Sequence, residues 1–344
     1  MTNFLTKKPI IALSPMDGIT DEPFRLIQTQ IAKPDLMFTE FVSAEGISHG
    51  GIKLYDTLLF SSQERPIIGQ LFGKNPDSFY NSAVILCELG FDGMDINMGC
   101  PAKTVTQNGS GAALISKPDL AVEIIKATKK GINDYFEDKV KIIELGLNKK
   151  TLTVIKRNKN YSNITSKKNK PTISVKTRLG IDKSIIESWA SLLLDQGLDF
   201  LTIHGRTLKQ AYAGTADWSE IKKVVDLAKN TKTKIFGNGD IQSRLEALEF
   251  CQKYGVDGVL IGRFACGNPW CFKNYTATPK ERFSAMLLHA QLFKEIFPHR
   301  RFNPLRKNFL FYASGLPNAK QLRSKIVHLN SIEDLLQLEA DFLT

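Results

Sequence analysis

The chain has 344 residues, of which 42% are hydrophobic and 24% are charged. This length allows a large α/β domain or a barrel with a smaller domain, and it excludes a small disulfide scaffold. No apolar run approaches the ~20 residues that a membrane span needs, and the N-terminus lacks the order of a signal peptide, so we expect a cytoplasmic protein. The 46 Lys and Arg against 35 Asp and Glu give a net charge of +11, which favours a polyanionic partner such as nucleic acid.

Eight short, apolar, β-prone segments bounded by Gly, Pro, Asn or Asp predict strands. They are Ile10–Leu13, Leu36–Thr39, Ile67–Leu71, Gly93–Ile96, Ile173–Thr177, Phe200–Ile203, Ile235–Gly237 and Val259–Ile261. Helix-like stretches separate most of them, at 77–89, 118–130, 184–196, 219–228 and 243–254. The strand starts recur roughly every 25 to 35 residues, which is the rhythm of a (β/α)8 TIM barrel, expected over residues 1–270.

One interval departs from this rhythm. The fourth and fifth strands start 80 residues apart, at 93 and 173, and the excess lies at about residues 131–170. Within this insertion, Lys149–Lys170 carries eight Lys or Arg and no acidic residue. Such a stretch is typical of a flexible, solvated excursion, which is the favoured interpretation, or of an arm that contacts RNA, and we assign no structure to it from the sequence.

After the eighth strand, four helix-like segments predict a small all-helical domain over residues 279–344. They cover 279–297, 304–313, 317–329 and 332–342, each with Pro or another turn residue near its start. Between Ile296 and Ile332 there are seven Lys or Arg and no acidic residue. A solvated helical face would have this composition, but together with the net charge it favours an RNA-binding domain.

The carboxyl ends of the eight predicted strands are unusually polar. In barrels of this kind the active site is built at those ends. They carry Ser14-Pro15-Met16-Asp17, Glu40, Gln70, Asn97 with Cys100, Lys176 with Arg178, His204 with Arg206, Asn238-Gly239-Asp240 and Gly262-Arg263.

The loops after the seventh and eighth strands, Asn238-Gly239-Asp240 and Gly262-Arg263, combine glycines with a cation, and this is the usual phosphate position in a barrel. From the fifth strand, Lys176 would place a second cation near the barrel axis, suited to negative charge on a reduced flavin ring. FMN fits both ends of such a site. A strand-end lysine also suits Schiff-base chemistry, which stays open.

Cys100 lies in a Gly- and Pro-rich loop just after a strand, beside polar residues, and this favours a proton donor or a nucleophile. The five cysteines are an odd number without paired short spacings, so we expect neither disulfides nor a metal site. They are Cys87, Cys100, Cys251, Cys266 and Cys271.

In this order, the motifs resemble the FMN-dependent tRNA-dihydrouridine synthases from Pro9 to about Pro269. The matching segments are Ser14–Asp21, Thr39-Glu40-Phe41, Gln70–Gly73, Asp95–Pro101, Gly109–Leu114, Val175–Arg178, His204–Thr207 with Tyr212, Gly237–Ile241 and Ile261–Arg263. The segments around Cys100 and His204 are the most specific ones.

The resemblance implies an enzyme that reduces the C5=C6 bond of a uridine in tRNA and uses NADPH to reduce its FMN. It assigns a hydride from the flavin N5 to C6 of the base and a proton from Cys100, as general acid, to C5. The residues expected to hold FMN are Pro15, Met16, Asp17, Gln70, Lys176, His204, Asn238, Gly239, Asp240, Gly262 and Arg263. The residues expected to contact the RNA substrate are Asn97, Arg178, Arg206, Arg306 and Lys307.

The segment Arg306–Tyr312 is similar to the basic helix that the family uses on the tRNA backbone. The last helices look most like the bacterial branch that acts on uridine 16 of the D-loop, and we expect a monomer. Two other classes stay open: an FMN-dependent small-molecule enzyme, such as a dihydroorotate dehydrogenase or an ene-reductase, and a non-catalytic tRNA-binding protein.

Overall fold

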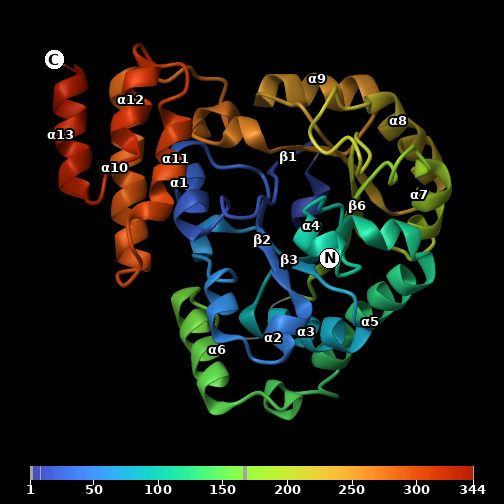
Figure 1. Cartoon of the computed structure of the whole chain (residues 1–344). Coiled ribbons are helices and arrows are strands. Elements are labelled where there is room, and N and C mark those ends of the chain that lie inside the picture. The colour runs from blue at the N-terminus through green and yellow to red at the C-terminus, as the bar shows by residue number, and fades with distance from the viewer. Residues whose placement is uncertain (1–2, 8, 166–168, 344) are drawn as a thin grey trace.

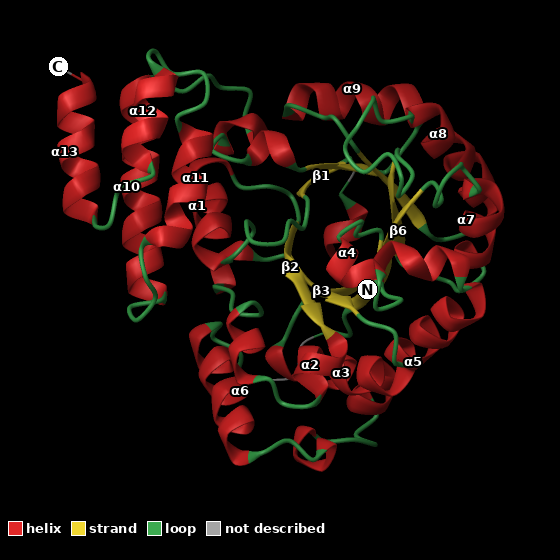
Figure 2. Cartoon of the chain, in the orientation of Figure 1, coloured by secondary structure: helices red, strands yellow, loops and turns green. Residues whose placement is uncertain are grey.

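Eight parallel strands form the centre of the molecule, shown by the computed structural model (Figure 1 and Figure 2). The structure describes residues 3–7, 9–165 and 169–343. The strands are β1 (Ile10–Leu13), β2 (Met37–Ser43), β3 (Ile67–Phe72), β4 (Gly93–Met98), β5 (Thr172–Arg178), β6 (Phe200–His204), β7 (Lys234–Asn238) and β8 (Gly258–Ile261). The ladder runs in the order β1-β8-β7-β6-β5-β4-β3-β2, and the pair Ala12 and Leu36 joins its two ends. The predicted barrel is therefore confirmed.

Aromatic side chains fill one end of the barrel. Phe200 stacks on Phe236 with ring centroids 4.8 Å apart, and Phe38 meets Phe200 edge to face at 6.3 Å. Phe4 and Leu5, before the first strand, pack against this cluster. Because this packed layer fills the interior near the starts of the strands, a ligand can enter only from their carboxyl ends.

Helices surround the barrel. They are α1 (Glu22–Ala32), α2 (Ala44–Ser48), α3 (Pro76–Leu89), α4 (Lys103–Thr106), α5 (Pro118–Phe136), α6 (Lys149–Tyr161), α7 (Ile186–Leu194), α8 (Trp218–Leu227) and α9 (Arg244–Tyr254). Their ends follow local capping rules. In α3, for example, the Asn75 side chain accepts the amide of Ser78, Pro76 occupies the first turn, and Gly90 ends the helix with a φ of 76°.

The insertion, to which the sequence assigns no structure, contains a short helix at Ile142–Leu145 and helix α6 where the structure describes it. The connection between β2 and β3 has only short helices, and α6 lies along it, between α1 and α3 (Figure 1). Thr151 Oγ1 donates to the carbonyl of Gly50 at 3.1 Å, and Asn158 Nδ2 donates to that of Tyr55 at 2.8 Å. Residues 166–168 of the predicted excursion lie outside the described residues.

The C-terminal segment forms four helices, as predicted: α10 (Pro279–Ile296), α11 (Asn303–Tyr312), α12 (Ala319–Ile326) and α13 (Ile332–Leu343). They share an apolar core, separate from that of the barrel, in which Phe283, Phe309 and Leu335 are fully buried. Helix α10 packs against α1, which places the helical group beside the barrel (Figure 1). No helix in the described ranges is long and apolar enough to cross a membrane.

Candidate active site

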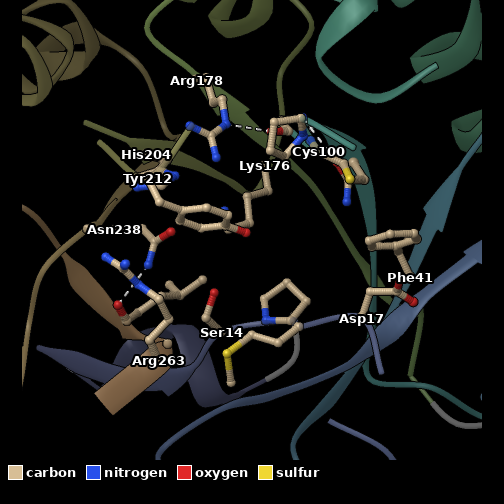
Figure 3. Close-up of a pocket in the computed structure, with 18 of the residues that line it drawn as sticks. Ser14, Asp17, Phe41, Cys100, Lys176, Arg178, His204, Tyr212, Asn238 and Arg263 are labelled. Carbon is tan, nitrogen blue, oxygen red and sulfur yellow. Dashed lines mark hydrogen bonds between the residues drawn. The ribbon is translucent and has the colours of Figure 1, made fainter. Parts of the chain in front are cut away.

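A cavity of about 550 Å³ opens at the carboxyl ends of the strands. Fourteen of the seventeen predicted site residues line it. Figure 3 labels several of them, among them Cys100, Lys176 and Arg263, which converge on the cavity from different strands and their loops. These fourteen are Pro15, Met16, Asp17, Gln70, Asn97, Cys100, Lys176, Arg178, His204, Asn238, Gly239, Asp240, Gly262 and Arg263. The other three, Arg206, Arg306 and Lys307, lie outside its lining.

A chain of hydrogen bonds between side chains leads from the barrel interior to the Cys100 loop. Gln70 Nε2 donates to Asp95 Oδ2 at 2.7 Å, and Asn97 Nδ2 donates to Gln70 Oε1 at 3.0 Å. Asn97 Oδ1 in turn accepts the backbone amides of Gly99 at 3.0 Å and of Cys100 at 2.8 Å. The side chain of Asn97 therefore holds the Cys100 loop in place.

Asp95 anchors this chain in the interior. It is fully buried, and Ser174 Oγ donates to its Oδ1 at 2.6 Å. Burial raises the pKa of Asp95 to about 6, although its hydrogen bonds with Ser174 and Gln70 oppose the rise. A carboxylate bonded on both oxygens gives the Gln70 amide one fixed orientation, which also fixes that of Asn97.

The Cys100 thiol faces the cavity from this loop. Burial raises its pKa, and the nearby Asp17 adds to the rise, so the thiol carries its proton at neutral pH. A protonated thiol beside a cavity is able to act as a proton donor.

Lys176 projects into the same cavity from β5, and the ladder pairs it with Asn97 on β4. Burial lowers the pKa of Lys176 to about 8, and the neighbouring Arg178 adds to this effect. The ammonium forms no hydrogen bond with the rest of the described chain. It is therefore a cation available to a ligand.

Arg206 lies outside the lining of the cavity, and its role in substrate binding stays a prediction. Its side chain is 1% exposed. Its Nη2 donates to both Asp240 oxygens, at 2.8 and 2.7 Å, and to the carbonyl of Gly214 at 2.6 Å. Arg206 therefore positions Asp240 and the loop around Gly214.

The loops after β7 and β8 form the other end of the cavity. No hydrogen bond links the backbone amides of Gly239, Asp240, Gly262 and Arg263 to another part of the described chain. Gly239 has a φ of +129°, and a Cβ there would come within 2.6 Å of the Cβ of Ala216. The glycine is thus required by its backbone conformation and its close neighbour.

Sequence reasoning did not select Tyr212 as a site residue, although this residue appears among the matching motifs. Its side chain is 58% exposed, and its ring extends into the cavity (Figure 3). The guanidinium of Arg263 lies 5.1 Å from the centre of that ring. Phe41 was also missed, and it follows Glu40 at the end of β2. For both residues the available signal was their place in the matching motifs, Phe41 directly after Glu40 and Tyr212 after His204–Thr207.

Two predicted RNA contacts lie on α11 of the helical group. Lys307 Nζ donates to the carbonyl of Gly18 at 3.3 Å, and its charge opposes the rise that burial causes in the pKa of Asp17. Lys307 is thus at the rim of the cavity. Arg306 donates to the carbonyl of Leu329 and to the side chain of Asn330, both at 2.7 Å, so it holds α11 to the segment between α12 and α13, and its contact with RNA stays a prediction.

The sequence matches the family model described as Dihydrouridine synthase (Dus) over residues 11–160 and 160–344. The chain belongs to the dihydrouridine synthase family. Two relatives are a "Probable tRNA-dihydrouridine synthase" of Staphylococcus aureus strain COL, 34% identical, and a "Probable tRNA-dihydrouridine synthase 2" of Bacillus subtilis strain 168, 33% identical. Each match covers 97% of this chain, with 93% and 94% of the two relatives.

Membership of the dihydrouridine synthase family confirms the resemblance and makes the protein an enzyme of an oxidoreductase family. The family match spans the barrel and the helical group, and it divides at residue 160, near the end of α6. Among solved structures, DHODH of Eimeria tenella is similar at 12% identity and a TM-score of 0.46, over 73% of this chain and 74% of that one.

Proposed function

We propose that this protein reduces uridine to 5,6-dihydrouridine in tRNA, with FMN bound in the cavity and NADPH as the electron donor. The observation that carries the proposal is the placement of Cys100 and Lys176 on one cavity, from neighbouring strands. The names of the relatives, which all specify tRNA-dihydrouridine synthase, give the substrate class.

The residues of the cavity fit FMN. The unbonded amides of Gly239, Asp240, Gly262 and Arg263, with the Arg263 side chain, suit a phosphate group. Met16 and Leu260 offer apolar surface to a planar ring, and the unpartnered ammonium of Lys176 suits negative charge on that ring. When bound, FMN supplies the hydride that uridine reduction requires.

The residues of this chain supply the proton and the geometry. Saturating the C5=C6 bond needs a proton at C5 as well as a hydride at C6. The protonated thiol of Cys100 gives up that proton, and the Asn97 side chain holds the loop that aims it. Arg178 lines the same cavity, and its contact with the uracil ring stays a prediction.

A uridine in folded tRNA must leave its stack to reach this cavity, so the protein must grip the RNA around it. The helical group beside the barrel presents exposed cations for this purpose, among them Lys320 and Arg323 on α12 and Lys307 at the cavity rim. We propose uridine 16 of the D-loop as the target, because the sequence of these helices resembles that of the bacterial branch that acts on this position.

One experiment tests the proposal. Purified protein is incubated with unmodified tRNA and NADPH, and the digested RNA is searched by mass spectrometry for a uridine that has gained two hydrogens. A gain that maps to the D-loop supports the proposal. NADPH consumption by a flavin-containing protein without a tRNA product would indicate a small-molecule flavin reductase instead.

A further inference from the structure

A second cavity, of about 580 Å³, adjoins the first one on its β2 and β3 side. The two cavities share Asp17, Phe41 and Ala102. Ala102 is only two residues from Cys100, so the second cavity begins beside the proposed proton donor. A ligand that occupies the first cavity has room to continue into the second.

Aromatic and aliphatic side chains form one part of the walls, and polar side chains form the rest, including Thr57, Lys74, Thr104, Asn108 and Ser110. Phe41 and Phe72 meet edge to face with ring centroids 5.0 Å apart. Leu54 and Val105 face the same space. Such walls suit a flat ring, because stacking on aromatic side chains stabilises a bound base whatever its identity.

The acidic residues give the cavity its polarity. Glu45 is already committed, since its oxygens accept the Ser43 hydroxyl and the amides of Lys74 and Asn75. By contrast, no side chain of the described residues donates a hydrogen bond to the Glu40 carboxylate, and the nearby amide of Gly18 acts only to lower its pKa. Burial raises the pKa of Glu40 to about 7, with Asp21 and Asp17 adding to the rise, so about half of the free protein carries a proton on this carboxyl at neutral pH, and a ligand with two N–H donors would stabilise the anion.

This chemistry selects the type of group that binds. Three acidic residues, Asp17, Glu40 and Glu45, line the cavity against one cation, Lys74, and this balance disfavours a phosphate of the RNA backbone. A carboxylate pairs best with a ring edge that presents two neighbouring N–H donors. Among the four RNA bases, guanine has that edge, at N1 and N2, whereas adenine, cytosine and uracil each place an acceptor beside the donor.

We propose that the second cavity binds a guanine base adjacent to the target uridine, with its ring against Phe72 and its N1 and N2 donors on Glu40. The inference rests on the proposed function and extends it, because it makes the neighbouring nucleotide part of substrate recognition. Flanking nucleotides are a known source of selectivity in enzymes that act on an extruded base.

The test uses the holoenzyme and tRNA transcripts in which the nucleotide on each side of the mapped uridine is replaced in turn. Each position carries G, A, C, U or an abasic site. For the wild type, kcat/KM is expected to fall about tenfold at one of the two positions when guanine is replaced. tRNA binding without NADPH should weaken by a similar factor.

Three variants locate the effect. Glu40→Gln should remove the preference for guanine, and Phe72→Leu should weaken binding of all four bases but not of the abasic transcript. Glu249→Gln, an exposed acid on α9, is the matched control and should keep the wild-type preference. Flavin content and melting temperature verify that each variant is folded.

The outcomes separate the two proposals. Equal rates with every neighbouring base, unchanged by Glu40→Gln, would overturn the guanine site while uridine reduction stands. A preference for guanine that survives in Glu40→Gln would also overturn it. Absence of dihydrouridine from all transcripts would overturn the proposed function, and the guanine site with it.

Discussion

Asn97 Oδ1 accepts the backbone amide of Cys100 at 2.8 Å, and this bond connects the barrel interior to the loop that carries the thiol. Asn97 was predicted to hold the uracil. Its oxygen already accepts two amides, and its Nδ2 donates to Gln70. The residue therefore acts first as a positioning group for Cys100. Its hydrogen bond to Gln70 connects the Cys100 loop to the buried side chains of the barrel interior.

Asn97→Ala should lower kcat for dihydrouridine formation by about tenfold or more, because the proton donor loses its support. Flavin content should stay near that of the wild type, since Asn97 lies away from the amides after β7 and β8. Asn97→Asp keeps both acceptor bonds to the loop but loses the donor to Gln70, so its kcat should fall less. Single-turnover kinetics with tRNA measure both. A normal kcat for Asn97→Ala would show that the Cys100 loop keeps its conformation without the Asn97 side chain.

Cys100→Ala should retain flavin and should still oxidise NADPH in the presence of oxygen. Its rate of dihydrouridine formation should fall by about 100-fold or more, as expected when a general acid is lost. Cys87→Ala, on α3 and outside the cavity, is the control for loss of a thiol. Mass spectrometry of the tRNA and NADPH absorbance are followed together. Equal product yields from the two variants would remove Cys100 from the chemistry.

The barrel was predictable because each strand is a short apolar segment bounded by Gly, Pro, Asn or Asp. The site was largely predictable because the carboxyl ends of all strands lie at the same end of a closed barrel. Arg206 was not predictable. Its burial depends on Asp240, which is 34 residues away, and on the carbonyl of Gly214. Sequence reasoning assigns an arginine beside a strand-end histidine to the ligand, and only the three-dimensional loop shows that its donors are already used.

Helix α6 escaped prediction for a different reason. Two of its buried residues, Thr151 and Asn158, are polar and bond carbonyls of the β2–β3 connection, so the helix has an amphipathic period but few apolar residues to mark its buried face. Ile155 alone is apolar among the buried residues of this helix. The exposed lysines dominate the composition and suggest disorder. Whether those lysines touch RNA stays open.

Lys176 should make flavin binding depend on pH. The apoprotein, titrated with FMN, should bind more weakly as the pH rises through about 8, because the lysine loses its positive charge there. Lys176→Arg should bind with a flat profile over the same range, and Lys176→Ala should purify with little flavin. Fluorescence quenching of FMN measures the affinity. If the FMN affinity of the wild type depends on pH as little as that of Lys176→Arg, the charge of Lys176 does not contribute to flavin binding.

The exposed cations of α12 should bind RNA phosphates. The double charge reversal Lys320→Glu with Arg323→Glu should weaken tRNA binding and reduce the slope of log K against log salt by about 1 to 2. The same reversal at Lys126 and Lys232, exposed positions on and after barrel helices, is the control. Filter binding across a salt series gives the slopes. Identical slopes for both double variants would place the RNA on another face.

Glu22 should make the stability of the fold fall as the pH rises. It is 1% exposed on α1, and burial, with Glu64 adding to the effect, raises its pKa well above the ordinary value. The folded state therefore holds this proton more tightly than the unfolded chain. Stability is highest below the ordinary pKa of a glutamate and is lost as the pH rises toward the raised value.

Glu22→Gln removes this dependence. Each unit of pKa shift corresponds to about 1.4 kcal/mol, so the variant should gain at least that much relative to the wild type on going from about pH 5 to about pH 8. Urea denaturation at both values measures the difference in the free energy of unfolding. Because Glu64 is paired with Arg25 in the same cluster, Glu64→Gln should instead destabilise the fold, by leaving a buried guanidinium without its carboxylate. If the wild type and Glu22→Gln show the same pH dependence, Glu22 is ionised in the folded protein and its charge is compensated.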